Sequence, residues 1–303
     1  MDCAALLSLF LPLATALPPP ADLSAPSFRR LAAAGTATNR WIELRGRTFS
    51  LRDEFSIPTG RALRIRGPGH IIGDSHSLFK LAGRSCLECE TGVRLSHRAS
   101  PQRAHRRELG AAVFALGKSH VLLRNVSITS ERGFGVWMVQ RARVELMDGS
   151  DLHHCGRSAI VAFGKAQLSM VDSSVRRAHL HGVCARGDSQ LLLRRTRIEE
   201  CGVRGCYAYH NASLELQHCT LAANGRAVAE AVADGLARRP TATLQVEALR
   251  REDRARLRVE GCRLVRNVGD GLRVAGHVEL HCDGLVHGGG IDDVTRVGGH
   301  AEL

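Results

Sequence analysis

Short stretches of alternating apolar and polar residues recur along the chain at nearly constant intervals. Each contains two apolar residues separated by one position, and the first of each pair stands at position 121, 144, 168, 191, 214, 257 or 278. The intervals between these positions are 23, 24, 23, 23, 43 and 21 residues. Since alternate residues of a β-strand point to the same face, each pair marks a strand with one buried face. The pattern predicts a strand that returns about every 23 residues.

A second apolar series keeps the same register and also contains an interval of 43 residues at the same place. One coil of the predicted solenoid therefore carries about 20 extra residues, and we place this insertion at residues 231–253. Small residues recur in step, and we expect the cysteines among them to act as small buried apolar side chains. The apolar series is Ile128, Leu152, Val175, Ile198, Leu221 and Leu264, and the small series is Ser173, Thr196, Cys219 and Cys262.

A third strand is predicted in each coil by "GFGVWMVQ", "SAIVAFGK", "GVCARGD", "GCYAYHN" and "GLRVAGH". Glycine or another small residue precedes each strand, as a tight corner with unusual backbone angles requires. One coil of three short strands cannot bury an apolar face, but stacked coils share a continuous core. We therefore predict an all-β parallel solenoid over residues 41–285, followed by a glycine-rich tail at 286–303.

Two regions of the sequence also resemble a known fold family. Residues 41–95, with "IELRG" near their start and "IRGPG" further on, resemble the opening coils of the pectate-lyase-like superfamily. From Val113 onward the units resemble the parallel β-helix repeat of that superfamily and of F-box β-helix proteins. The resemblance implies a right-handed parallel β-helix. It does not imply one reaction, because that superfamily includes lyases, hydrolases, epimerases, adhesins and non-enzymatic binders.

The N-terminal segment, residues 1–40, allows two interpretations. Its apolar stretch and the small residues around Ala16 favour a secretory signal peptide and hence a secreted or extracellular protein. Residues 6–41, with "LPPPADL" and "FRRL", also resemble an F-box, which implies a cytoplasmic or nuclear adaptor that docks a ubiquitin-ligase scaffold. No run of 18 apolar residues occurs, so we expect no membrane span.

Composition excludes several classes of function. The net charge is +12, but 39 of the 42 basic residues are arginines spread along the chain, and no nucleic-acid recognition motif is present. We therefore expect no nucleic-acid partner. The pair Cys86 and Cys89 has metal-ligand spacing but no second pair accompanies it, so we expect neither a metal nor a cofactor. Ten cysteines in 303 residues are also too few for a disulfide scaffold.

The third strand of each coil also carries the candidate ligand-binding residues. If residues such as Cys206 and Ala208 point into the core, their neighbours must point outward. The predicted outward face can stack sugar rings on its aromatic side chains and pair carboxylates with its arginines. The sequence thus predicts a site for an extended ligand, a polysaccharide or a peptide; cover by the N-terminal segment or the insertion, and a stripe without function, remain alternatives. The predicted ligand-binding residues are Trp137, Phe163, Arg186, Tyr207, Tyr209 and Arg273.

Catalytic residues are not predicted. The outward strand positions carry arginines but no acids, whereas calcium-dependent lyases need several carboxylates and glycosidases need two. The sequence favours a binding protein and leaves a polysaccharide lyase or epimerase as the alternative if the chain is an enzyme.

Overall fold

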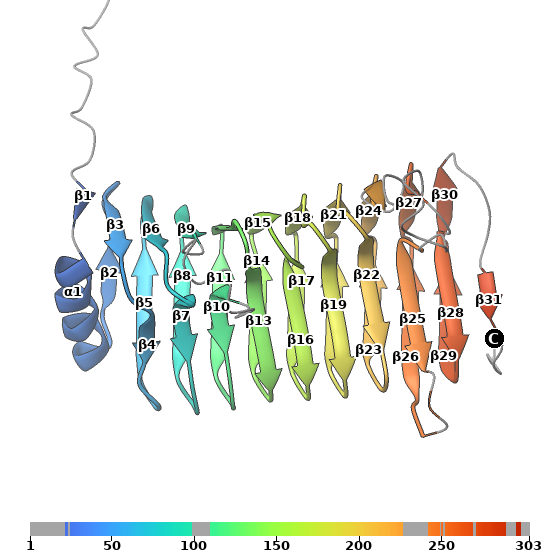
Figure 1. Ribbon diagram of the computed structural model, residues 1–303, viewed down its shortest axis with the longest axis horizontal. Coiled ribbons are helices and arrows are strands. Elements are labelled where there is room, and N and C mark those ends of the chain that lie inside the picture. Colours follow the sequence, from blue (N-terminus) through green and yellow to red (C-terminus); the bar gives the residue numbers. More distant parts are fainter. Residues whose placement is uncertain are drawn as a thin grey trace, which may run out of the picture.

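The computed structural model describes residues 22–23, 25–98, 110–226, 242–248, 250, 252–268, 271–288 and 295–297. These residues form a parallel β-helix whose coils stack side by side along the long axis of the molecule (Figure 1). Each full coil contributes one strand to each of three sheets, and neighbouring coils pair in parallel. The predicted all-β solenoid is confirmed.

Within the described residues, sheet A has 11 strands, and sheets B and C have 10 strands each. Sheet A contains β1 (Asp22–Leu23), β3 (Thr48–Leu51), β6 (Gly69–Gly73), β9 (Val93–His97), β12 (Ser127–Ser130), β15 (Asp151–Cys155), β18 (Ser174–Arg176), β21 (Arg197–Glu199), β24 (Thr220–Ala222), β27 (Arg263–Val265) and β30 (Val286–Gly288). Sheet B contains β2 (Trp41–Glu43), β5 (Ala62–Arg66), β8 (Cys86–Glu90), β11 (His120–Arg124), β14 (Arg143–Met147), β17 (Gln167–Val171), β20 (Gln190–Arg194), β23 (Ser213–Gln217), β26 (Ala255–Glu260) and β29 (Val278–Asp283). Sheet C contains β4 (Phe55–Ile57), β7 (Ser77–Leu81), β10 (Ala111–Ala115), β13 (Phe134–Gln140), β16 (Ile160–Gly164), β19 (His181–Gly187), β22 (Arg204–Tyr209), β25 (Leu244–Ala248), β28 (Leu272–Gly276) and β31 (Thr295–Val297).

The core follows the predicted register. Val121 pairs with Val144 in sheet B, and Ile128 pairs with Leu152 in sheet A, and all four side chains are fully buried. The residues of the small series are buried too, and the backbone N–H of Cys219 donates to Cys262 Sγ at 3.3 Å. Identical positions of successive coils therefore stack on one another, which confirms the 23-residue repeat.

The glycines before the sheet C strands serve a different purpose from the one predicted. Gly135, Gly182 and Gly205 do not have positive φ angles. A Cβ atom on Gly182 would instead lie 2.5 Å from Ile198 Cγ2 and 2.6 Å from the carbonyl oxygen of Gly205. These positions need glycine because neighbouring coils approach too closely for a side chain.

The N-terminal end of the β-helix is covered by α1 (Ala25–Thr38), which lies across the first coils (Figure 1). Phe28 of this helix is fully buried, and its ring centroid lies 5.4 Å from that of Phe49 and 5.5 Å from that of Phe55. Part of the segment predicted as a separate N-terminal module is thus joined to the β-helix. The predicted cleavage site after Ala16 lies outside the described residues.

The structure changes two boundaries drawn from the sequence. Leu244–Ala248, inside the predicted insertion at 231–253, form strand β25 and pair with both β22 and β28. This strand lacks the glycine or alanine that marked the others, because Thr243 takes the place held by Gly205 one coil earlier. Strands β30 and β31 also lie in the range predicted as a tail, since parallel pairing continues beyond the last clear sequence repeat.

Within the described part of the chain, α1 is too short to cross a membrane, and no other segment forms a helix that could.

Candidate ligand-binding face

The six predicted ligand-binding residues all lie on the outward side of sheet C. Outward positions form two rows in which each residue pairs in register with the next, and neighbouring strands of a sheet are about 4.8 Å apart. The first row is Trp137, Val161, Cys184, Tyr207, Gln245 and Arg273, and the second is Val139, Phe163, Arg186, Tyr209, Glu247 and Ala275. We call these two rows, together with Phe114, Phe134, His181 and Arg204 at their margin, the aromatic face.

The two tyrosines form the centre of the aromatic face. Their rings stack with centroids 4.9 Å apart and an interplanar angle of 21°. The Arg186 guanidinium lies 4.7 Å from the ring centroid of Phe163 and 5.3 Å from that of Tyr209. The Arg204 guanidinium lies 4.5 Å from the ring centroid of Tyr207. Arginines and aromatic rings therefore alternate in contact across β16, β19 and β22.

Trp137 belongs to a second aromatic group. Its ring stacks on that of Phe114 with centroids 4.6 Å apart. The ring centroid of Phe134, on the same strand as Trp137, lies 5.5 Å from that of Trp137. The small outward residues Val161 and Cys184 separate this group from the tyrosines. Phe114 was not among the predicted residues, although the alternation in "AAVFA" was enough to place it one coil before Trp137.

A carboxylate also lies on this face, which corrects the prediction that its outward positions carry no acids. The Tyr207 hydroxyl donates to Glu247 Oε2 at 2.7 Å. Arg204 Nε donates to Gln245 Oε1 at 2.7 Å, and the Gln245 amide donates to Glu247 Oε1. Glu247 was missed because its strand, β25, was assigned to the insertion.

Tyr207 and the neighbouring His181 are held in their neutral forms. Burial, with the hydrogen bond to Glu247, raises the pKa of Tyr207 above its ordinary range. Burial, with the nearby charge of Arg204, lowers the pKa of His181 to about 3. The His181 Nδ1 atom is buried without a hydrogen-bond partner among the described residues. A general base works best with a pKa near the operating pH, so neither group is suited to abstract a proton at neutral pH.

The charge of the aromatic face is unbalanced. Arg186, Arg204 and Arg273 form no ion pair within the described part of the chain, and Arg273 Nε is buried without a hydrogen-bond partner there. In the two outward rows of the described strands β13 to β28, Glu247 is the only carboxylate. Burial also lowers the pKa of Arg204, because a partly desolvated cation lacks a full counter-charge. The face thus presents positive charge that an anion can neutralise.

Surface hollows lie elsewhere, on the outward face of sheet B. One is lined by polar side chains of β14, β17, β20 and β23, and another by side chains of β23, β26 and β29. The charges there are matched: Arg143 Nε lies 2.9 Å from Glu145 Oε1, and Arg258 contacts both Glu215 and Glu260. In these two hollows, therefore, the arginines have carboxylate partners within the sheet, unlike those of the aromatic face.

Metal ligands do not converge in the described residues, where no three histidine, cysteine, aspartate or glutamate side chains gather as a metal site requires. Cys86 and Cys89 point to opposite sides of β8, with Cys89 buried and Cys86 partly exposed. Burial raises the pKa of Cys86 to about 11, so this thiol is protonated at neutral pH.

The match to a family model agrees with the fold. Residues 105–236 match the sequence model of a family described as "Right handed beta helix region". No curated protein matches the chain. Among solved structures, the mannuronan C-5 epimerase AlgE4 A-module of Azotobacter vinelandii matches with 11% identity over 90% of this chain and 96% of that chain, with a TM-score of 0.30. The family match and the stacked parallel coils together identify the described repeat as a right-handed parallel β-helix.

Proposed function

We propose that the protein binds an extended acidic polysaccharide along the aromatic face. The observation that carries this proposal is that Arg186 and Arg204, which form no ion pair with a described residue, lie over aromatic rings on one sheet surface. Aromatic faces provide apolar area against which a sugar ring packs, and a guanidinium binds a carboxylate through two parallel hydrogen bonds. An acidic sugar chain satisfies both kinds of group at once.

The geometry of sheet C favours a ligand that runs parallel to the helix axis. The outward rows continue from β13 to β28 through in-register pairing, so outward positions recur at the same place on each strand. From β16 to β28 the rows extend over about 19 Å at the usual strand spacing. A polymer with repeated rings and carboxylates matches this periodic arrangement better than a compact ligand does.

Binding is favoured over lyase or epimerase chemistry by the protonation states on the face. Both of those reactions need a group that abstracts a proton from the sugar. Tyr207 has a raised pKa and His181 a pKa of about 3, so the phenol holds its proton and the imidazole is a weak base. We therefore propose a non-catalytic role for this face.

An extended peptide is a weaker candidate for the same face. Peptides gain affinity from sheets mainly by hydrogen bonding to an exposed edge strand, whereas β16, β19 and β22 are paired on both sides. The F-box-like adaptor has no supporting observation among the described residues. We accordingly propose secretion as the route to a polysaccharide ligand, and mass spectrometry of the mature N-terminus tests the predicted cleavage after Ala16.

Calorimetric titration with uronate oligosaccharides, neutral oligosaccharides of equal length and an acidic peptide tests the proposal. We expect binding of the uronates, with an affinity that falls as salt rises because the contacts include exposed charges. Equal binding of the neutral oligosaccharides would contradict the role of the arginines. If the peptide bound more tightly than the uronates, the inferred ligand would be a peptide and not a polysaccharide.

A further inference from the structure

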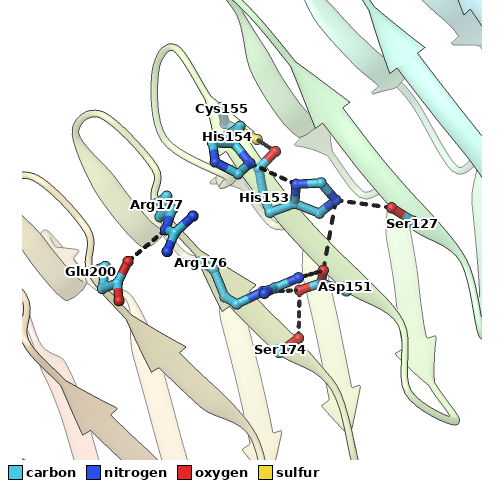
Figure 2. Close-up of polar contacts among 9 residues, drawn as sticks. All are labelled: Ser127, Asp151, His153, His154, Cys155, Ser174, Arg176, Arg177 and Glu200. Carbon is cyan, nitrogen blue, oxygen red and sulfur yellow. Dashed lines mark hydrogen bonds and ion pairs between the residues drawn. The ribbon is translucent and has the colours of Figure 1, made fainter.

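A second group of polar side chains lies on the outward side of sheet A, around β12 and β15 (Figure 2). Ser127 Oγ and His153 Nε2 are 3.0 Å apart, within hydrogen-bond distance. His153 Nδ1 and His154 Nδ1 are 2.8 Å apart. Asp151 Oδ2 lies 3.8 Å from His153 Nε2. The hydroxyl, the two imidazoles and the carboxylate thus form one connected network.

An irregularity in the strand pairing creates this network. Ser127 pairs in register with Asp151, and Thr129 pairs with His153, but the next pair is Ser130 with Cys155. His154 is therefore the extra residue of a β-bulge relative to β12, and it has a left-handed backbone with φ of 51°, as do the equivalent residues Arg177 and Glu200 of the next two coils. Successive side chains of a regular strand point to opposite faces, whereas the bulge brings the two imidazoles together.

The hydrogen bonds define the roles that the two nitrogens of His153 can take. When His153 Nδ1–H donates to His154 Nδ1, the Nε2 lone pair is free to accept the Ser127 hydroxyl proton. Burial is the main cause that lowers the pKa of His153, so the ring is neutral at pH 7. A neutral imidazole hydrogen-bonded to a serine hydroxyl is the arrangement that activates serine as a nucleophile.

One carboxylate beside His153 supports a transient positive charge on the ring, against the effect of the neighbouring cations. Asp151 is fixed by Arg176, which donates to it through Nε and a terminal nitrogen, and by the hydroxyl of Ser174. The carboxylate lies beside the nitrogen that would receive the proton, and it opposes the effect of burial on the pKa of His153. The remaining charged or titratable groups that face the ring are His154, Arg176 and Arg177.

We propose that Ser127 and His153 form a serine-dependent site that hydrolyses exposed carboxylic esters, with His154 as a positioning residue. Ser127 is partly exposed on the outward face, and Arg94 occupies the adjacent register position on β9 with an exposed side chain. A guanidinium in this place can stabilise the negative oxygen of a tetrahedral intermediate. The site lies on a different sheet from the aromatic face, so the proposal does not depend on polysaccharide binding.

The reaction requires only the ester and water. Ser127 Oγ attacks the carbonyl carbon while His153 Nε2 takes the hydroxyl proton, and the resulting tetrahedral intermediate expels the alcohol, which receives that proton. This leaves an acyl group on Ser127. Water then attacks the acyl carbon, His153 accepts a proton from it, and the carboxylic acid and the serine hydroxyl are released.

Covalent labelling tests the nucleophile directly. The full chain is treated with a fluorophosphonate, which bonds its phosphorus to an activated serine oxygen and releases fluoride, and the labelled peptide is mapped by mass spectrometry. We expect the adduct on Ser127, and a loss of labelling of at least a hundredfold in Ser127→Ala. Ser169→Ala, on the outward face of sheet B, is the matched control and should label as the original chain does.

Hydrolysis of p-nitrophenyl acetate tests turnover. We expect Ser127→Ala and His153→Gln to lose at least a hundredfold in kcat/KM, with Ser169→Ala unchanged. His154→Ala should lower kcat about tenfold and move the pH–rate midpoint upward, because the neighbouring imidazole lowers the pKa of His153. Circular dichroism confirms that each variant is folded. An adduct on another residue, no turnover above buffer, or hydrolysis by folded Ser127→Ala within twofold of the original chain overturns the proposal.

Discussion

Sheets B and C share one backbone architecture but present opposite kinds of surface. In sheet B, charged residues alternate in sign between neighbouring coils: Arg66 Nε lies 2.6 Å from Glu43, Arg64 lies 3.2 Å from Glu88, and Arg256 lies 2.8 Å from Glu279. On sheet C, Arg186 and Arg204 lie over aromatic rings instead and form no ion pair with a described residue.

The difference shows how a repeat protein can separate structure from binding. Exposed ion pairs contribute only about 0–1 kcal/mol each, so the sheet B pairs add little stability, but they leave no charge for a ligand. The arginines of the aromatic face form no such ion pairs with described residues. Because the same coils form both sheets, variants of one face have natural controls on the other.

The largest expected effect comes from removing the aromatic centre of the face. In Tyr207→Ala/Tyr209→Ala we expect the affinity for uronate oligosaccharides to fall at least thirtyfold, about 2 kcal/mol, as truncation of buried aromatic contacts typically costs. Calorimetric titration measures it. Leu192→Ala, an outward position of sheet B, should leave the affinity unchanged. Binding that survives the double substitution would place the ligand elsewhere.

The second largest effect should be the pH dependence of stability that the buried imidazole of His181 gives to the aromatic face. The pKa of His181 is about 3 in the folded chain against an ordinary 6.5, so only the unfolded state gains a proton between these values. Its contribution to the free energy of unfolding is therefore present above pH 6.5 and is lost as the pH falls towards 3. Between pH 7 and pH 5 the loss is about 2 kcal/mol. Urea unfolding of the original chain and of His181→Gln at both pH values measures it, and equal losses in the two proteins would contradict this assignment.

A single arginine should matter on sheet C and not on sheet B. We expect Arg186→Ala to lower the affinity for uronates about tenfold, because it removes a guanidinium that has no ion pair with a described carboxylate. Arg258→Ala, whose guanidinium is already paired with Glu215 and Glu260, is the matched control. Titration at two salt concentrations should show a weaker salt dependence only in the sheet C variant, and equal effects of both substitutions would remove the contrast between the faces.

Removing the carboxylate of the aromatic face should have the smallest effect. Glu247→Gln makes the face more positive, so we expect about threefold tighter uronate binding. The pKa of Tyr207 should also fall, because the hydrogen bond and charge of Glu247 raise it. The chain has only two tyrosines, so ultraviolet titration of tyrosinate can follow this change. An unchanged titration would show that Glu247 is not in contact with Tyr207.

The fold was predictable from the sequence because its repeat is local. Alternation within each strand requires Cys206 and Ala208 to be buried, and the 23-residue spacing places Tyr209 beside Arg186 without further information. Such predictions depend only on side-chain period and on stacking of equivalent positions.

The chemistry of both faces depended on contacts that the repeat does not encode. Glu247 accepts a hydrogen bond from Tyr207, which lies 40 residues earlier in the chain. The contact forms because β25 pairs in register with β22 after a longer connection, and no small residue before β25 indicates this strand in the sequence. His153 and His154 meet because one extra residue is accommodated as a bulge. The sequence by itself determined the coil, the inward and outward faces and the aromatic stripe. Only the tertiary structure decided which polar groups are partnered, because pairing between distant strands and local departures from the repeat set those distances.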